Sequence, residues 1–226
     1  RRKKTVNNMN PPYNAVVFDM DGVLTDTEKV YRQCWTMNGM SEGLTAQQMK
    51  VVCDRLAGGT RATNALVVKE YLGEDFDYIP FRKKTMDMFQ EYIDEHGIDL
   101  KSNVVSTLTE LKRHGVKMAL ATSTDRQKAV DRLTRTGLID FFDETVCGDE
   151  IEKGKPHPDI YLKACEKLKV SPDRAVAVED SVNGVISASD AGLCTVMVVD
   201  LIKPNDTTNE RTDKTCYNIQ EILELF

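Results

Sequence analysis

The sequence predicts an α/β fold in which a doubly wound, Rossmann-like parallel-sheet core carries an inserted all-helical domain. Two observations predict the core: short apolar runs end in polar clusters, and helical patterns of roughly 10 to 15 residues lie between them. A third observation predicts the insertion. The interval between Thr27 and Leu100 shows helical patterns and no convincing buried strand.

The core strands are predicted from runs rich in Val, Ala and other apolar residues. The first run, Tyr13–Phe18, leads into a loop that begins at Asp19, as a buried strand would. The other predicted strands are Val116–Ala121, Arg174–Val178 and Thr195–Val199. The helical patterns between and around them are Val104–His114, Arg126–Thr136, Pro158–Leu168 and Ser181–Ala191. We expect a loop from Lys203 to Tyr217 and a short helix at Ile219–Phe226.

Four helical patterns make up the insertion: Lys29–Met37, Thr45–Leu56, Thr60–Tyr71 and Pro80–His96. Ligands of such sheets bind at the carboxyl ends of the strands, so an insertion after the first strand is expected to act there as a lid. The expected domains are a core of residues 13–26 and 101–226 and a helical cap of residues 27–100. Residues 1–12 are expected to be a flexible leader.

Composition and charge narrow the class of protein. The 226 residues are 41% hydrophobic and 29% charged, as in ordinary globular proteins, and the net charge is −6. The only dense basic run is Arg1–Lys4, which we interpret as part of the leader, with an address signal as the alternative. We therefore expect no nucleic-acid partner. No apolar run approaches the roughly 18 residues of a membrane span, and six cysteines without a C-x-x-C pair favour reduced thiols in the cytoplasm.

Polar clusters directly follow three of the predicted strands. They are Asp19 with Asp21, Thr122, and Glu179 with Asp180. Because parallel strands end at one edge of the sheet, these side chains are expected to line one crevice. Taken alone, the first pair is better explained by Asx turns that cap the loop.

Four segments in this order resemble the motifs of the haloacid dehalogenase-like superfamily. They read F-D-M-D-G-V-L, A-T-S-T, K-G-K-P-H-P-D-I-Y and V-E-D-S-V-N-G-V. The likeness covers nearly everything from Val16 to Val199 and is greatest to the helical-cap phosphatases and β-phosphoglucomutases. The resemblance implies phosphoryl transfer in the crevice.

The chemistry of phosphoryl transfer agrees with the roles that the resemblance implies. Asp19 would be the nucleophile and form an aspartyl phosphate, while Asp21 would protonate the leaving oxygen and later deprotonate the attacking water. Gly22 would let the backbone approach the ligand. Thr122, Ser123 and Lys155 would bind the transferring phosphoryl group, the lysine through its fixed positive charge.

A hard cation is also expected, because a carboxylate that approaches a phosphate dianion is repelled by it. The predicted cofactor is Mg²⁺, which prefers oxygen ligands. The expected ligands are Asp19, the Asp21 carbonyl and Asp180, with Glu179 as either a further ligand or a partner of a bound water. His157 is left out, because the resemblance places no chemistry there and exposed loop histidines are common.

Substrate choice is expected to come from the cap. Gly59, Thr60 and Arg61 open a predicted helix, so backbone amides and a guanidinium could hold an anion there. A plain helix start with a solvated Arg61 explains the run equally well.

The predicted function is hydrolysis of a small phosphomonoester, such as a sugar or polyol phosphate, by a monomer or weak dimer. A β-phosphoglucomutase-like mutase is the first alternative. The mutase is favoured by Thr25-Asp26-Thr27 and Trp35. Glu28 does not favour it, and neither does Tyr31, which stands where the mutases carry histidine. Dehalogenation is disfavoured because dehalogenases lack the second aspartate found here as Asp21. A binding module without catalysis is the remaining alternative, and the complete set of catalytic positions argues against it.

Overall fold

The computed structural model describes residues 13–56 and 61–226, with the side chains of residues 61–63 outside the description. The predicted leader, residues 1–12, lies outside the described part. The chain divides into two compact units. The core unit comprises the described residues up to Thr25 together with Leu100–Phe226, and the helical unit comprises Asp26–Asp99. Among the described residues, no helix has the length and apolar character needed to cross a bilayer.

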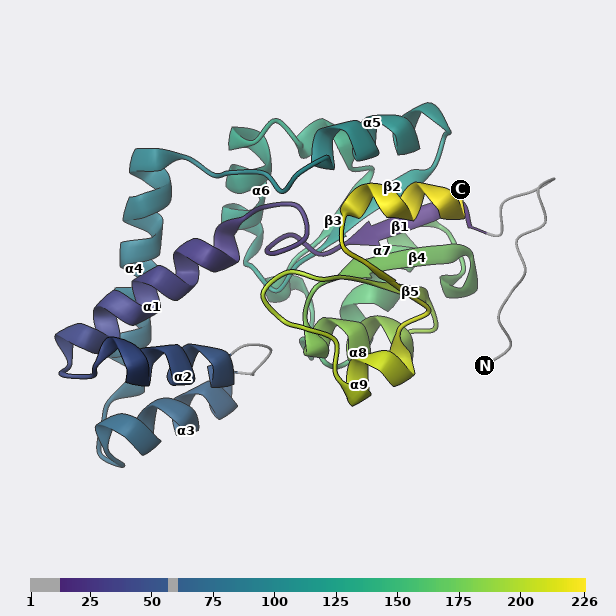
Figure 1. Ribbon diagram of the computed structural model, residues 1–226. Coiled ribbons are helices and arrows are strands. Elements are labelled where there is room, and N and C mark those ends of the chain that lie inside the picture. Colours follow the sequence, from purple (N-terminus) through teal and green to yellow (C-terminus); the bar gives the residue numbers. More distant parts are fainter. Residues whose placement is uncertain (1–12, 57–60) are drawn as a thin grey trace. The chain divides into compact units, whose positions relative to one another are not determined.

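The core unit is built on a six-stranded sheet, and all its paired neighbours are parallel. The strand order is β3-β2-β1-β4-β5-β6 (Figure 1). The strands are β1 (Ala15–Phe18), β2 (Lys117–Ala121), β3 (Glu144–Val146), β4 (Ala175–Glu179), β5 (Cys194–Val198) and β6 (Lys214–Cys216). This sheet, with helices on both faces, confirms the predicted fold class.

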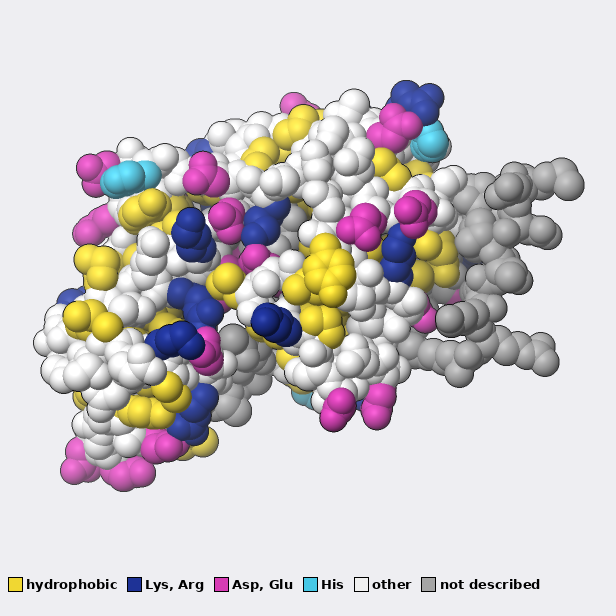
Figure 2. Space-filling model, viewed as in Figure 1, with side chains coloured by type: hydrophobic (Ala, Val, Ile, Leu, Met, Phe, Trp, Pro, Cys, Tyr) yellow, Lys and Arg dark blue, Asp and Glu magenta, His cyan; other side chains and the backbone are white. Residues whose placement is uncertain are grey.

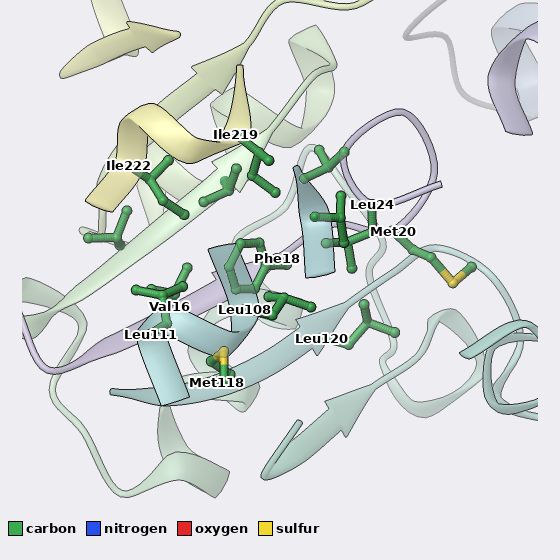
Figure 3. Packing of buried hydrophobic residues seen from close by; sticks show 14 of the residues in the cluster. Val16, Phe18, Met20, Leu24, Leu108, Leu111, Met118, Leu120, Ile219 and Ile222 are labelled. Carbon is green, nitrogen blue, oxygen red and sulfur yellow. The ribbon is translucent and has the colours of Figure 1, made fainter. Parts of the chain in front are cut away.

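Alternation along the central strands sends large and small side chains to opposite faces. Val16 and Phe18 of β1 join Met118 and Leu120 of β2 in one apolar cluster (Figure 3). The alternate residues, Ala15 and Val17 of β1 with Ala119 and Ala121 of β2, belong to a second cluster on the other face. All four residues of β1 are buried, as expected for a parallel strand covered on both sides.

Helices cover both of these faces. The first cluster includes residues of α5 (Val104–Arg113), α6 (Arg126–Arg135) and a C-terminal 3-10 helix, Ile219–Leu225. The second includes residues of α7 (Asp159–Leu168) and α8 (Val182–Asp190). Figure 1 shows α5 and the C-terminal helix on one side of the sheet and α8 on the other. Three single-turn 3-10 helices complete the connections: Ile139–Phe141, Gly148–Glu150 and Pro172–Arg174.

The expected loop from Lys203 to Tyr217 is wrong in part. This segment contains α9 (Asp206–Arg211) and the edge strand β6. Asn205 starts α9 by accepting a hydrogen bond from the Thr208 amide, and the Thr208 hydroxyl accepts one from the Asn205 amide. Asn and Thr are common in loops, but here they form a helix cap.

The helical unit contains four helices and, among its described residues, no strand. They are α1 (Thr27–Ser41), α2 (Ala46–Leu56), α3 (Arg61–Leu72) and α4 (Tyr78–His96). Trp35 of α1 is buried between aromatic rings of α4; its ring lies 6.3 Å from that of Tyr78 and 5.4 Å from that of Phe81. The buried Asn38 amide donates hydrogen bonds to the Phe81 carbonyl and the Thr85 hydroxyl, which fixes α1 on α4.

Basic and acidic side chains both occur across the face of the protein shown in Figure 2. Exposed charged side chains form ion pairs within one element or between neighbouring elements, such as Arg55 with Glu70 and Lys83 with Asp87. Exposed pairs of this kind contribute little to stability.

Candidate active site

Three polar sites meet at the carboxyl ends of adjacent strands. Asp19 follows β1, Thr122 follows β2, and Glu179 ends β4 with Asp180 next to it. Because β1 lies between β2 and β4, these residues share one stretch of the sheet edge. The Asp19 amide still donates to the Val178 carbonyl at 3.0 Å, so the strand pairing itself holds Asp19 beside Asp180.

Lys155 links Asp19, the candidate nucleophile, to the carboxylate of Glu179. Its ammonium nitrogen lies 2.6 Å from Asp19 Oδ1, 2.5 Å from Glu179 Oε1 and 3.0 Å from the Ala121 carbonyl. An ammonium group has three N–H donors, and these three acceptors match them. The side chain is only 6% exposed. The Lys155 charge is therefore held in one place by three elements of the core.

The site raises the pKa values of Asp19 and Lys155. Burial, opposed by the Lys155 charge and assisted by the Glu179 charge, raises the pKa of Asp19 to about 7. Burial opposes the charged form of Lys155, but the carboxylates of Asp19 and Glu179 outweigh it and raise the pKa of this ammonium. Lys155 therefore remains positive beside Asp19.

The loop after β1 is closed by backbone hydrogen bonds. The amides of Leu24 and Thr25 donate to Met20 O at 2.9 and 3.1 Å, and the Gly22 amide donates to Thr25 O. Gly22 has φ +82°, and a Cβ there would lie 2.1 Å from Asp180 Oδ2. Glycine thus permits both the turn and the close approach of the Asp180 carboxylate.

Glu179 is fully buried and accepts hydrogen bonds at both oxygens. Oε1 accepts from Lys155 and from the Tyr161 hydroxyl at 2.7 Å. Oε2 accepts from the Ser181 hydroxyl and from the amides of Asp180 and Ser181. A Cβ at Gly184 would lie 2.0 Å from these oxygens, so the start of α8 packs directly on the carboxylate. Glu179 is thereby placed to hold Lys155 and the loop that carries Asp180.

The loop after β2 is folded on itself. The Thr122 hydroxyl is buried and accepts a hydrogen bond from the Thr124 amide at 3.1 Å, which leaves its own O–H to donate elsewhere. The Ser123 side chain is exposed, and its carbonyl leaves no space for a Cβ at Gly148, which would lie 2.3 Å away. The loop after β2 is thus held by its own Thr124–Thr122 hydrogen bond and by close packing against Gly148.

The carboxylate of Asp21 has two partners that sequence reasoning missed. Arg132 Nη1 donates to Asp21 Oδ1 at 3.0 Å and to Oδ2 at 3.3 Å, and the Thr124 hydroxyl donates to Oδ2 at 3.2 Å. Arg132 is 4% exposed. Its helix was predicted, but five charged side chains lie in that helix, and the sequence does not show which of them points inward.

Tyr161 was also missed as a site residue. It lies within the K-G-K-P-H-P-D-I-Y motif and is fully buried on α7, with the Lys155 nitrogen 5.3 Å from its ring centre. Burial, followed by the Glu179 charge, raises its pKa well above the ordinary value, so it stays a hydrogen-bond donor. His157 of the same motif has an exposed side chain.

Three carboxylates could hold a metal ion. One oxygen each from Asp19, Glu179 and Asp180 lies within 4.8 Å of the others. This all-oxygen set fits Mg²⁺, which takes one or two carboxylates and keeps several waters. Since both Glu179 oxygens already accept hydrogen bonds, Asp19 and Asp180 are the better suited side chains. Glu179 fits better as their support.

The predicted anion site in the helical unit lies largely outside the described residues. Gly59 and Thr60 lie outside the described residues, and of Arg61 only the backbone, which begins α3, is described.

The family model of the haloacid dehalogenase-like hydrolases matches residues 13–192. A phosphorylated carbohydrates phosphatase from Thermotoga maritima is 34% identical over 79% of this chain and 82% of its own length. A β-phosphoglucomutase from Bacillus subtilis is 30% identical over 81% of this chain and 82% of its own length.

Solved structures show the same fold. A Thermotoga maritima protein with the provisional name β-phosphoglucomutase is 31% identical and superposes with a TM-score of 0.75, covering 94% of this chain and 97% of that one. A CbbY variant from Rhodobacter sphaeroides in complex with xylulose-(1,5)bisphosphate is 25% identical, with a TM-score of 0.71 over 93% of this chain and 96% of that one.

Proposed function

The chain belongs to the haloacid dehalogenase-like hydrolase family, and from that premise we propose that it is a Mg²⁺-dependent phosphomonoesterase that works through an aspartyl phosphate on Asp19. Its relatives support phosphate-ester hydrolysis in general terms. The observation that carries the proposal is the buried Asp19 carboxylate with the Lys155 ammonium at 2.6 Å, beside Asp180 at the carboxyl edge of the sheet.

The first half of the proposed reaction transfers the phosphoryl group to the protein. An Asp19 carboxylate oxygen attacks phosphorus, the bond from phosphorus to the ester oxygen breaks, and Asp21 gives its proton to that oxygen. The Thr122 hydroxyl and the Lys155 ammonium face the charge that develops on the phosphoryl oxygens. Lys155 is already held by Glu179 and Ala121, so little reorganisation is required.

The second half returns Asp19 to its starting state. Asp21, now a carboxylate, takes a proton from a water molecule, and the water oxygen attacks phosphorus. The bond between phosphorus and Asp19 breaks, and inorganic phosphate is released. Asp21 is then protonated again and ready for the next ester.

We propose that Asp19, Asp180 and the backbone carbonyl of Asp21 hold Mg²⁺. When bound, this cation would offset the repulsion between the Asp19 carboxylate and the phosphate dianion. Gly22 supports the assignment, because its lack of a side chain leaves room for the Asp180 carboxylate beside the loop that carries Asp21.

The proposed substrate is a small phosphorylated sugar or polyol. The name of the Thermotoga maritima relative, a phosphatase of phosphorylated carbohydrates, supports this class. We also propose that the cap, residues 27–100, selects the substrate and that Gly59, Thr60 and Arg61 contact its distal groups. Arg61→Ala should then raise KM for sugar phosphates more than for phenyl phosphates, which have no distal polar groups.

A mutase activity is the second candidate, and the β-phosphoglucomutase relative at 30% identity favours it. Within the helical unit, however, Trp35 is 3% exposed and packs in the apolar cluster. The Tyr31 ring packs edge-on against Trp35 at 6.0 Å and against Phe89 at 5.7 Å. Both aromatic residues are thus accounted for by cap packing, and neither argues for mutase chemistry.

A phosphate-release assay tests the proposal. Purified protein, stripped with a chelator and resupplied with Mg²⁺, should release phosphate from a panel of sugar, polyol and nucleotide monophosphates. Asp19→Asn should abolish release, whereas Asp125→Asn, on an exposed loop residue, should not. Conversion of β-glucose 1-phosphate to glucose 6-phosphate without net phosphate release would decide for the mutase. No turnover of any ester, with or without a bisphosphate activator, would reject both.

A further inference from the structure

Arg132 is a buried cation on the apolar side of a helix. On α6, Ala129, Arg132 and Leu133 stand three and four residues apart, so they share one helical face, and all three are buried. Ala129 and Leu133 belong to the large apolar cluster. An ionised side chain in such a place is costly unless it is paired with an opposite charge. The Asp21 side chain is its partner, with 3.0 Å between Arg132 Nη1 and Asp21 Oδ1. Asp21 supplies the opposite charge when it is ionised, and its Oδ1 still accepts the hydrogen bond when the other oxygen carries the proton that the proposed reaction needs.

A second donor reaches the same carboxylate from the phosphate-binding loop. The Thr124 hydroxyl lies 3.2 Å from Asp21 Oδ2, and the Thr124 amide donates to Thr122, the proposed phosphoryl-binding hydroxyl. The Thr124 carbonyl accepts from the Gly148 amide at 3.1 Å, which anchors the loop. The orientation of Asp21 is therefore coupled to the loop that would bind the phosphoryl group.

We propose that Arg132 and Thr124 are positioning residues for the proposed reaction: together they hold the Asp21 carboxyl where it meets the leaving oxygen. This inference rests on the proposed role of Asp21 as proton donor. An aspartate has two freely rotating side-chain bonds, and Asp21 lies in a loop with its side chain 28% exposed. Two donors from separate elements, α6 and the loop after β2, restrict that rotation. A proton donor displaced by about 1 Å can lose roughly 100-fold in rate.

A comparison of leaving groups separates positioning from general damage. An alkyl phosphate, such as a sugar phosphate, needs a proton on its leaving oxygen, whereas 2,4-dinitrophenyl phosphate releases a stable anion that needs none. Transfer of the phosphoryl group to Asp19 determines kcat/KM for both esters. Loss of the Asp21 orientation should thus lower kcat/KM for the alkyl ester alone.

The experiment measures kcat/KM for both esters in Arg132→Met, with Arg135→Met as the matched control. Arg135 stands on the same helix, is exposed, and pairs with Asp131. For Arg132→Met we expect a loss of about 10- to 100-fold with the alkyl ester and less than about 3-fold with the activated ester. Arg135→Met should change neither value. Equal losses with both esters, or none with either, would overturn the proposal.

Two further variants keep the result interpretable. Thr124→Val removes the hydroxyl and little volume, and it should give the same selective loss at a smaller size even if Arg132→Met does not fold. Asp21→Asn should also be selective, and adding Arg132→Met to it should cause no further loss. If Asp21→Asn is selective but neither Arg132→Met nor Thr124→Val is, the positioning role is wrong while the proposed function stands. If the wild-type protein cleaves neither ester, the proposed function fails and this inference fails with it.

Discussion

The Lys155 ammonium lies 2.6 Å from the Asp19 carboxylate, although the two residues are 136 positions apart in the chain. The same ammonium contacts Glu179, so one cation joins two buried carboxylates at the carboxyl ends of β1 and β4. The contact follows from the fold, because β1 and β4 are adjacent strands and Lys155 precedes the helix that packs beneath them. Substitutions in this cluster should therefore change activity, Mg²⁺ requirement or stability in ways that can be measured.

Lys155→Met should lower both activity and stability. The variant removes the charge that faces the phosphoryl group, which we expect to reduce kcat about 100- to 1000-fold. It also leaves Glu179 buried without its cation, at a cost of about 3 to 5 kcal/mol in the free energy of unfolding. Steady-state kinetics and urea unfolding measure the two effects. Lys163→Met, which removes a lysine of α7 that donates to the Glu150 carbonyl, is the control and should retain activity. Equal losses of activity and stability in Lys155→Met and Lys163→Met would contradict the role assigned to Lys155.

Gly22→Ala should impair the site more than an equally strained glycine elsewhere. Gly115 has φ +69° with nothing within 4 Å of an added Cβ, whereas at Gly22, with φ +82°, the Cβ would lie 2.1 Å from Asp180 Oδ2. Both substitutions should cost about 1 to 2 kcal/mol for the backbone conformation. Only Gly22→Ala should also raise the Mg²⁺ concentration needed for half-maximal activity. The account of Asp180 would be wrong if Gly115→Ala shifted that concentration to the same extent.

Removing the charge of Asp180 should raise the Mg²⁺ requirement, whereas removing the charge of Glu179 should lower the free energy of unfolding. Asp180→Asn removes a proposed metal ligand, so the Mg²⁺ requirement should rise at least about tenfold with little change in stability. Glu179→Gln puts an amide where an acceptor contacts Lys155 and backbone amides, so unfolding should become easier by several kcal/mol, on the order of a broken buried ion pair.

Tyr161→Phe tests the structural role of Glu179 more mildly, since it removes one hydrogen-bond donor to Glu179. It should lower the free energy of unfolding by about 1 kcal/mol. Magnesium titrations and urea unfolding give both readouts. A larger magnesium effect for Glu179→Gln than for Asp180→Asn would make Glu179 a direct ligand.

Stability should fall at alkaline pH because of buried thiols. Burial raises the pKa values of Cys147, Cys165 and Cys216 from 9.0 to about 11. Between these values the unfolded chain loses thiol protons that the folded chain retains, so the free energy of unfolding decreases as pH rises from about 9 to 11. Urea unfolding across this range should show a shallower decrease for Cys165→Ala than for the wild type. If the free energy of unfolding decreased with pH as steeply in Cys165→Ala as in the wild type, the Cys165 thiol would not contribute to this pH dependence.

Much of the core could be predicted from the sequence because its strands are buried on both faces. The runs of β1, β2, β4 and β5 are predominantly apolar, and each prediction came within two residues of the observed ends. The edge strands β3 and β6 were missed. Each has three residues, and Glu144-Thr145-Val146 contains too little apolar character to stand out from a loop.

The positions that follow the strands were also predictable, since the strand ends place Asp19, Thr122 and Asp180 at one edge. The interactions that orient them were not. Arg132 is one of several charged residues on an amphipathic helix, and only the packing of α6 shows that it is buried. The use of both Glu179 oxygens by Lys155, Tyr161 and Ser181 likewise depends on long-range contacts that no local pattern encodes.

Covalent trapping tests the central claim most directly. The protein is quenched with acid during turnover of a sugar phosphate, and the denatured chain is reduced with borohydride, which converts an aspartyl phosphate to homoserine. Peptide mass spectrometry then locates the reduced residue. We expect homoserine at position 19 in the wild-type protein and none in Asp19→Asn, which should also show no turnover. A trapped phosphate on another side chain, or sustained turnover by Asp19→Asn, would contradict the assignment of Asp19 as the nucleophile.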